Sequence, residues 1–167
     1  MVRPLHELTK KGVPYEWATK HQACFDRVIH LLLQQPCLRL PQFDRPFVIV
    51  SDASTTGVGA ALMQQHGEHL LPCAYFSRSL NSAERNYSAR ELEAYGVLLA
   101  FEKWRAYLWG YHAEVRVLTD HRSLEFLRTQ RDLTGRLARW CLRLNEFNFH
   151  VKYYPGRCNI VADALSR

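Results

Sequence analysis

Apolar and polar positions predict a run of strands between residues 46 and 77. Residues 46–54 contain four consecutive apolar side chains followed by small and polar ones, which is typical of a strand buried on both faces. Alternation then continues to about residue 65, and residues 66–68 have the composition of a hairpin turn. A third strand follows over residues 69–77. Three strands joined by short turns predict an antiparallel meander.

From about residue 83 to residue 109 the apolar spacing becomes that of a helix, and Gly110 is suited to end it. The apolar stripe of this helix consists of Ala94, Val97, Leu98, Phe101, Trp104 and Leu108. Alternation returns over residues 113–119 and predicts a fourth strand. Because a helical crossover joins the first strand to the fourth, we expect these two strands to pair in parallel.

The remaining pattern predicts a short helix at 123–129, a helix at 133–145, a fifth strand at 147–153 and a final helical segment at 159–167. The element order is β-β-β-α-β-α-α-β-α. This order predicts an α/β fold with a five-stranded mixed sheet, in which three antiparallel strands are followed by parallel ones.

Residues 1–45 differ from the rest of the chain. Apolar residues at helical spacing predict a helix at about 20–35, which Pro36 ends. Three prolines between residues 36 and 46 indicate an extended connector. We therefore expect a helical lead-in, residues 1–45, followed by a separate unit, residues 46–167.

Composition is that of a soluble globular protein, with 47% hydrophobic and 23% charged residues, and no apolar run is long enough to span a bilayer. Five widely spaced cysteines without a C-x-x-C pair argue against a disulfide framework and a zinc site. They favour a reducing, intracellular compartment, without separating cytoplasm from nucleus. The net charge of +6 points weakly to a polyanionic partner.

Two predicted strands end in the same way, one in Asp52 and the other in Asp120. If these strands are parallel neighbours, both carboxylates lie at the carboxyl edge of the sheet, where α/β proteins form binding crevices. Two like charges at this distance are unfavourable unless a cation lies between them, and hard oxygen ligands select Mg²⁺ or Mn²⁺. The alternative for each residue is a turn-capping or solvated acid.

Further acids lie on the predicted long helix and on the last predicted segment. The long helix offers Glu91 and Glu93 in its first turns, and helical periodicity does not choose between them. Asp163 stands among apolar neighbours in the last segment, which suggests that it has a partner. Spacing alone leaves open whether these acids meet.

This order of acids, together with the stretches around them, resembles the RNase H of gypsy-class LTR-retrotransposon (Ty3/gypsy-like) reverse transcriptases. The stretches that carry the resemblance are 51–54 with 57–60, 75–80, 84–88 with 91–93, 119–124, 135–140 and 159–167. Residues 8–12 and 15–17 are similar to the end of the polymerase part of such enzymes.

The resemblance implies an RNase H-like fold with helices on both faces of the sheet, and a metal-dependent endonuclease that hydrolyses the RNA strand of RNA–DNA hybrids. It implies Asp52, Glu91, Asp120 and Asp163 as catalytic, metal-binding acids for two Mg²⁺ ions, for which Mn²⁺ can substitute. Glu91 is preferred because Glu91-Leu92-x-Ala94 matches the Glu-Leu-x-Ala of the family. Residues 153–158 lack the histidine that many relatives carry before the last aspartate.

Several basic and polar residues are candidates for contact with the nucleic acid. Arg136, Arg139 and Arg143 fall on one face of the helix predicted at 133–145, although a solvated basic face explains them equally well. Weaker candidates are Arg78, Asn86, Ser88 and Arg122. The expected partners are an RNA–DNA hybrid and the remainder of a reverse transcriptase.

Two other functions stay open at this point. The chain could be a domesticated host copy that binds nucleic acid or a protein without cleaving, or a structural connector that braces a larger polymerase. The sequence does not decide between an active element and a host gene, and it does not give the oligomeric state.

Overall fold

The structure is a computed structural model, and it describes residues 2–34, 38–127, 130 and 135–167. The chain forms two compact units, Met1–Cys37 and Leu38–Arg167. This boundary precedes the division that the sequence predicts after residue 45. Residues 38–45 belong with the sheet because the Arg39 N–H donates to the Pro72 carbonyl oxygen (2.8 Å) and the Gln42 N–H donates to Gln64 Oε1 (2.8 Å).

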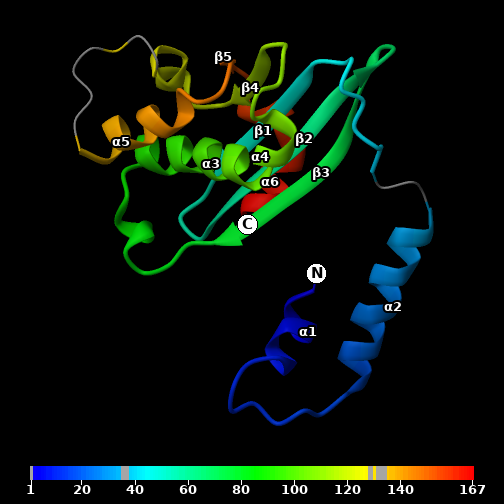
Figure 1. The fold of residues 1–167 in the computed structure, drawn as a ribbon. Coiled ribbons are helices and arrows are strands. Elements are labelled where there is room, and N and C mark those ends of the chain that lie inside the picture. The colour runs from blue at the N-terminus through cyan, green and yellow to red at the C-terminus, as the bar shows by residue number, and fades with distance from the viewer. Residues whose placement is uncertain (1, 35–37, 128–129, 131–134) are drawn as a thin grey trace. The chain divides into compact units, whose positions relative to one another are not determined.

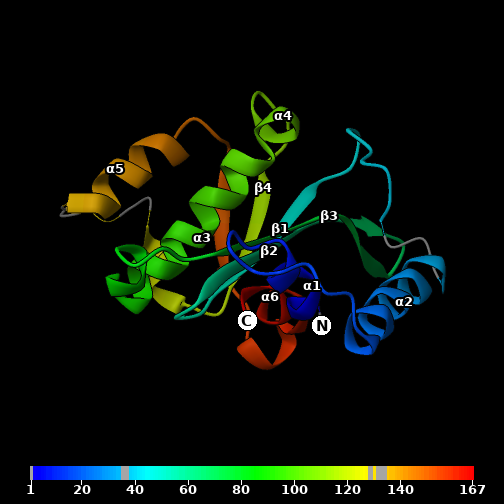
Figure 2. The same ribbon diagram turned by 90° about the horizontal axis from the view of Figure 1, so that it is seen from below.

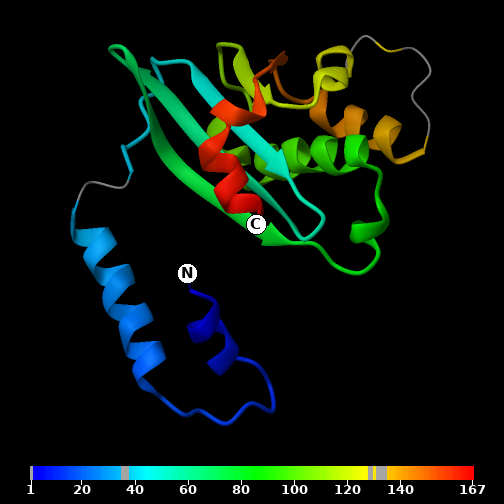
Figure 3. The same cartoon turned by 180° about the vertical axis from the view of Figure 1, so that it is seen from behind.

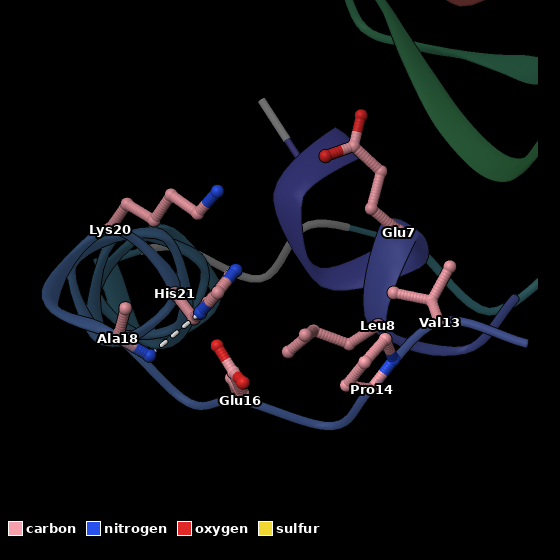
Figure 4. Close-up of a pocket in the computed structure, with 8 residues that line it drawn as sticks. All are labelled: Glu7, Leu8, Val13, Pro14, Glu16, Ala18, Lys20 and His21. Carbon is pink, nitrogen blue, oxygen red and sulfur yellow. Dashed lines mark hydrogen bonds between the residues drawn. The ribbon is translucent and has the colours of Figure 1, made fainter.

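The first unit contains helices α1 (Arg3–Leu8) and α2 (Thr19–Gln34). Helix α2 corresponds to the helix predicted at 20–35, whereas α1 is too short for the apolar pattern to predict. His21 Nδ1 accepts a hydrogen bond from the Ala18 N–H (2.8 Å) at the start of α2, beside a pocket of about 340 Å³ (Figure 4). This pocket is lined by Glu7, Leu8, Val13, Pro14, Glu16, Ala18, Lys20 and His21.

The second unit is built on a five-stranded sheet with the order β3-β2-β1-β4-β5 (Figure 1). Its strands are β1 (Phe47–Ala53), β2 (Gly57–His66), β3 (His69–Ser79), β4 (Val115–Thr119) and β5 (Phe149–Tyr153). The first three strands pair antiparallel, while β4 pairs in parallel with β1 on one side and β5 on the other. The predicted mixed sheet and the parallel pairing of the first and fourth strands are thus confirmed.

The helical segments of this unit are η1 (Glu84–Asn86), α3 (Ala89–Lys103), α4 (Arg105–Leu108), η2 (Arg122–Phe126), α5 (Gly135–Leu144), η3 (Gly156–Cys158) and α6 (Ile160–Ser166). The single helix predicted at 83–109 is therefore three segments. Ser88 starts α3 as its N-cap, and Trp104 (φ −106°, ψ 23°) leaves the helical conformation after it. The helix predicted at 123–129 is the 3₁₀ segment η2, and residues 128, 129 and 131–134 lie outside the described residues.

Helices cover both faces of the sheet, as the resemblance implies. Figure 1 shows α3 in front of the sheet, Figure 3 shows α6 lying over β1 and β2 from behind, and Figure 2 shows α3 and α6 on opposite sides. The main core lies on the α3 face, where side chains such as Ile49 and Val117 meet Val97 and Phe101. A smaller cluster that includes Val50 lies on the α6 face.

Helix α6 lies directly on the backbone of β2. A Cβ atom added to Gly59 would be 2.5 Å from the backbone nitrogen of Ser166 and 2.6 Å from the carbonyl oxygen of Ala162. Two hydroxyls also hold the last turn, because Ser77 Oγ donates to the Leu165 carbonyl oxygen (2.6 Å) and Ser54 Oγ donates to that of Ser166 (2.5 Å). The glycine at position 59 therefore sets how closely α6 approaches the sheet.

Within the described part of the chain, no helix combines the length and apolarity that a membrane span needs. The four described cysteines, Cys24, Cys73, Cys141 and Cys158, form no disulfide with one another. Cys37 lies outside the described residues.

We expect Gly59→Ala to lower the free energy of unfolding by about 1–3 kcal/mol, because its methyl group meets fixed backbone atoms of α6. Gly96→Ala is the matched control. Gly96 lies within α3, where an added Cβ has only ordinary contacts at 3.8 Å or more, so alanine should raise stability by roughly 0.5–1 kcal/mol. Urea unfolding measures both changes, and a Gly59→Ala protein as stable as the parent would contradict the close packing.

Candidate functional site

Three carboxylates meet at the carboxyl edge of the sheet. Asp52 comes from β1, Asp120 directly follows β4, and Glu93 comes from α3; each offers an oxygen that lies within 4.8 Å of the other two. The two aspartates are neighbours because β1 and β4 run parallel with Val50 opposite Leu118. Asp52 lies two residues after Val50, and Asp120 lies two residues after Leu118.

Glu93 is held between the ends of these two strands. Its side chain is almost fully buried, with 6% of its surface exposed. Oε1 accepts a hydrogen bond from the Ala53 N–H (3.0 Å), and Oε2 accepts one from Thr119 Oγ1 (3.2 Å). A buried carboxylate is costly unless it has such donors, so these two contacts fix its orientation.

The geometry differs from the preference for Glu91, because Glu93 is the glutamate that lies with Asp52 and Asp120. Glu91 lies in the first turn of α3, where Oε2 accepts from the Ser88 N–H (2.9 Å) and Oε1 forms an ion pair with Arg136 (2.9 Å). Two positions along a helix correspond to a rotation of about 200°, so Glu91 and Glu93 point in different directions. Ser88-x-x-Glu91 has the pattern of a capping box, which is the sequence signal that separates the two glutamates.

Asp163 lies near the three carboxylates but is turned toward a cation. Its Oδ1 accepts from Arg167 Nε (2.8 Å) and lies 2.6 Å from Arg167 Nη2. It does not belong to the group of oxygens around Asp52, Glu93 and Asp120. Its charge nevertheless reaches this group, since it contributes to raising the pKa of Asp52.

Burial and mutual repulsion make this edge of the sheet strongly unfavourable for three negative charges. Burial, then the charges of Asp52 and Asp120, raises the pKa of Glu93 to about 8. Burial also raises the pKa of Asp52, against the hydrogen bond from Ser166 and the charge of Arg167. Among the ion pairs of the described residues, none involves Asp52, Glu93 or Asp120. A cluster of oxygen donors in which no acid is ion-paired with a basic side chain fits a hard divalent cation.

Several neighbours of the acids were not predicted as site residues. Ser166 Oγ donates to Asp52 Oδ2 (2.5 Å), and a Cβ added to Gly156 would lie 2.9 Å from Asp120 Oδ2. Asn159 Nδ2 donates to the Ser51 carbonyl oxygen (2.9 Å) and ties the start of α6 to β1. These contacts join residues far apart in the chain, so no local pattern indicates them.

Three arginines predicted to bind nucleic acid have acidic partners within the domain. Arg136 pairs with Glu91, and its guanidinium also lies over the Tyr87 ring (4.3 Å). Arg143 pairs with Glu102. Arg78 bonds to the buried Glu84 (2.7 Å) and to the Tyr95 hydroxyl (3.1 Å), which makes it part of the fold.

The other predicted contact residues lie at the surface. Arg139 on α5 is exposed, as is Arg122, whose guanidinium lies 5.1 Å from the centre of the Tyr153 ring. Asn86 Nδ2 donates to the Ser82 carbonyl oxygen (3.1 Å), and Ser88 caps α3. For all of these residues, binding of nucleic acid stays a prediction.

Similar folds occur in solved structures of nucleic-acid enzymes. The chain resembles a foamy viral protease-reverse transcriptase in complex with an RNA/DNA hybrid, with a TM-score of 0.62 and 18% identity over 92% of this chain and 21% of that one. It also resembles LC11-RNase H1 in complex with an RNA/DNA hybrid, with a TM-score of 0.57 and 16% identity over 71% of this chain and 92% of that one. At these identities, the likeness shows the fold alone.

Relatives with higher identity are retrotransposon polyproteins. The chain is 40% identical over 165 residues to the retrovirus-related Pol polyprotein from transposon 412 of Drosophila melanogaster, and 35% identical over 170 residues to the transposon Tf2-3 polyprotein of Schizosaccharomyces pombe. These alignments cover 99% and 100% of this chain but 13% of each polyprotein. Residues 42–147 match the family model of the RNase H-like domain found in reverse transcriptase. The chain belongs to this family of RNase H-like domains, and its relatives are polyproteins of gypsy-class LTR retrotransposons.

Proposed function

We propose that this domain is a ribonuclease H that hydrolyses the RNA strand of RNA–DNA hybrids with the help of bound divalent cations. The observation that carries the proposal is the meeting of Asp52, Glu93 and Asp120, whose oxygens lie within 4.8 Å of one another. Membership of the RNase H-like family of reverse transcriptases supports it independently.

The donor set suits Mg²⁺, with Mn²⁺ as a substitute, because all three ligands are carboxylates. Two such ions, when bound, would supply an activated water and neutralise the charge that develops on the scissile phosphate. Glu93 is held in place by Ala53 and Thr119, while Asp120 is exposed and stands where a phosphate can approach from solvent. Asp163 adds negative charge beside Asp52.

The family and the surface around α5 support an RNA–DNA hybrid as the substrate. An RNA–DNA hybrid is bound in two structures with a similar fold, those of the foamy viral enzyme and LC11-RNase H1. Helix α5 presents the exposed residues Arg136, Arg139 and Arg143. The ion pairs of Arg136 and Arg143 are partly exposed, and such pairs contribute little to stability, so both guanidinium groups can exchange their carboxylate for a phosphate. Such contacts position a hybrid by its backbone and not by its sequence.

The rest of a reverse transcriptase is the natural context of this activity, because the chain covers only 13% of the polyproteins that it matches. A domesticated domain that binds without cleaving is the competing function. No feature of the described residues favours it, since Asp52, Glu93 and Asp120 are all present and together.

Removing either buried acid should abolish cleavage. We expect Asp52→Asn and Glu93→Gln to lower the rate of hydrolysis of a labelled RNA–DNA hybrid by at least about 100-fold in Mg²⁺, because each loses a charged ligand of the metal. Glu91→Gln is the matched control on the same helix. It loses the cap and the Arg136 pair, but it should keep most of the activity.

Two outcomes would contradict these assignments. Loss of activity in Glu91→Gln with retention in Glu93→Gln would restore the preference for Glu91. A parent chain that binds the hybrid but does not cleave it in Mg²⁺ or Mn²⁺ would favour the domesticated binding module.

Glu93 should also make stability depend on pH. Below pH 4.5 its carboxyl is protonated in both the folded and unfolded chains, whereas between pH 4.5 and about 8 only the unfolded chain releases the proton. Without metal, its contribution to the free energy of unfolding should therefore fall as pH rises through this window, by roughly 3–5 kcal/mol in total. Denaturant unfolding of the parent chain and of Glu93→Gln at a series of pH values measures this contribution as their difference.

Glu93→Gln, which has no carboxyl to ionise at this position, should become more stable relative to the parent chain as pH rises. Saturating Mn²⁺ should reverse this trend, because the bound ion favours the ionised carboxylates of the parent chain. A difference that stays constant with pH in the absence of metal would show that Glu93 titrates normally.

A further inference from the structure

Ser166 is a buried hydroxyl in direct contact with the acidic cluster. It is the last residue of α6 and has 2% of its surface exposed. Its Oγ lies 2.5 Å from Asp52 Oδ2 and 3.0 Å from the Asp163 carbonyl oxygen. A hydroxyl has one proton, and a carboxylate accepts it more strongly than a neutral carbonyl, so the bond to Asp52 is the stronger of the two.

The backbone that carries this hydroxyl is tightly fixed. Ser54 Oγ donates to the Ser166 carbonyl oxygen at 2.5 Å. Gly57 and Gly59 leave no space between β2 and Ser166, since a Cβ on either would approach its backbone atoms to 2.9 Å or less. The hydroxyl therefore reaches Asp52 from a backbone that is hydrogen-bonded to Ser54 and packed against β2.

Asp52 has fewer hydrogen-bond donors than Glu93, the other buried acid of the cluster. Its carboxylate is repelled by Asp120 and Asp163, and it is largely buried, with 8% of its surface exposed. Glu93 has the Ala53 N–H and the Thr119 hydroxyl to orient it. Among the side-chain hydrogen bonds of the described residues, the one that reaches the Asp52 carboxylate comes from Ser166.

We propose that Ser166 is a positioning residue, which orients the Asp52 carboxylate so that it can bind a divalent cation together with Glu93 and Asp120. This inference rests on the proposed function and deepens it. One hydrogen bond occupies a single lone pair of Oδ2, and the other lone pairs of the carboxylate stay available to the metal. The last helix thus serves the site through a hydroxyl as well as through the charge of Asp163.

A purely structural role makes a different prediction, and Ser77 separates the two. The Ser77 hydroxyl donates to the Leu165 carbonyl oxygen (2.6 Å), so it holds the same turn of α6 to the sheet. Among the hydrogen bonds of the described residues, none joins the Ser77 side chain to Asp52, Glu93 or Asp120. If Ser166 acts only by holding α6, the loss of either hydroxyl should have the same effect on the metal site.

The test is the affinity of the free 167-residue chain for Mn²⁺, measured without nucleic acid by the electron paramagnetic resonance signal of unbound Mn²⁺. We expect Ser166→Ala to weaken Mn²⁺ binding by roughly 10-fold, the effect typical of residues that orient a metal ligand. Ser166→Cys, which keeps the volume but is a weak donor, should show a similar loss. Ser77→Ala should bind Mn²⁺ as the parent chain does, and thermal melting shows that all variants are folded.

Three outcomes would overturn the inference. Parental Mn²⁺ affinity in Ser166→Ala shows that the hydroxyl does not position Asp52. Equal weakening in Ser77→Ala shows that docking of α6 is what matters. If the parent chain does not bind Mn²⁺, both this inference and the proposed function are wrong. If the parent chain binds Mn²⁺ and cleaves the hybrid, and Ser166→Ala binds Mn²⁺ equally well, only this inference is wrong.

Discussion

The parallel pairing of β1 with β4 is the constraint on which the rest of the structure depends. It places the ends of two strands that are distant in sequence at one edge of the sheet, and with them Asp52 and Asp120. Parallel pairing requires a crossover connection, which α3 belongs to. The same helix brings Glu93 back to that edge, so the topology that closes the core also assembles the acidic cluster.

This arrangement costs stability that packing elsewhere has to offset. A buried glutamate with a pKa of about 8 is held beside two aspartates, and no ion pair of the described residues neutralises any of the three. The opposing contribution comes from the core between α3 and the sheet, where Phe101 and Phe149 are completely or almost completely buried. Unfavourable electrostatics of this kind are typical of a site that binds a cation.

The pattern of apolar residues was sufficient for the fold because each strand alternates or is continuously apolar, and because a long helix between two strands favours parallel pairing. It did not show the break in the predicted helix 83–109, since Ser88 acts by capping and not by hydrophobicity. Asp52 and Asp120 could be predicted as neighbours because the parallel pairing of the strands before them could be predicted. The preference for Glu91 came from the match of Glu91-Leu92-x-Ala94 to the family, since apolar spacing does not choose between the two glutamates; the capping box that holds Glu91 away from the cluster was not considered. Ser166 was not predicted because its contact with Asp52 spans 114 residues.

The attachment of α6 to the sheet affects how the domain folds during its synthesis on the ribosome. The strands, α3 and α5 all precede α6, so the acids of β1, α3 and β4 can come together before the final helix exists. Ser166 follows Asp52 by 114 positions, which take about 6–23 s to translate at the usual rates. Until α6 is made, Val48 and Val50 lack the helix that later covers their face of the sheet.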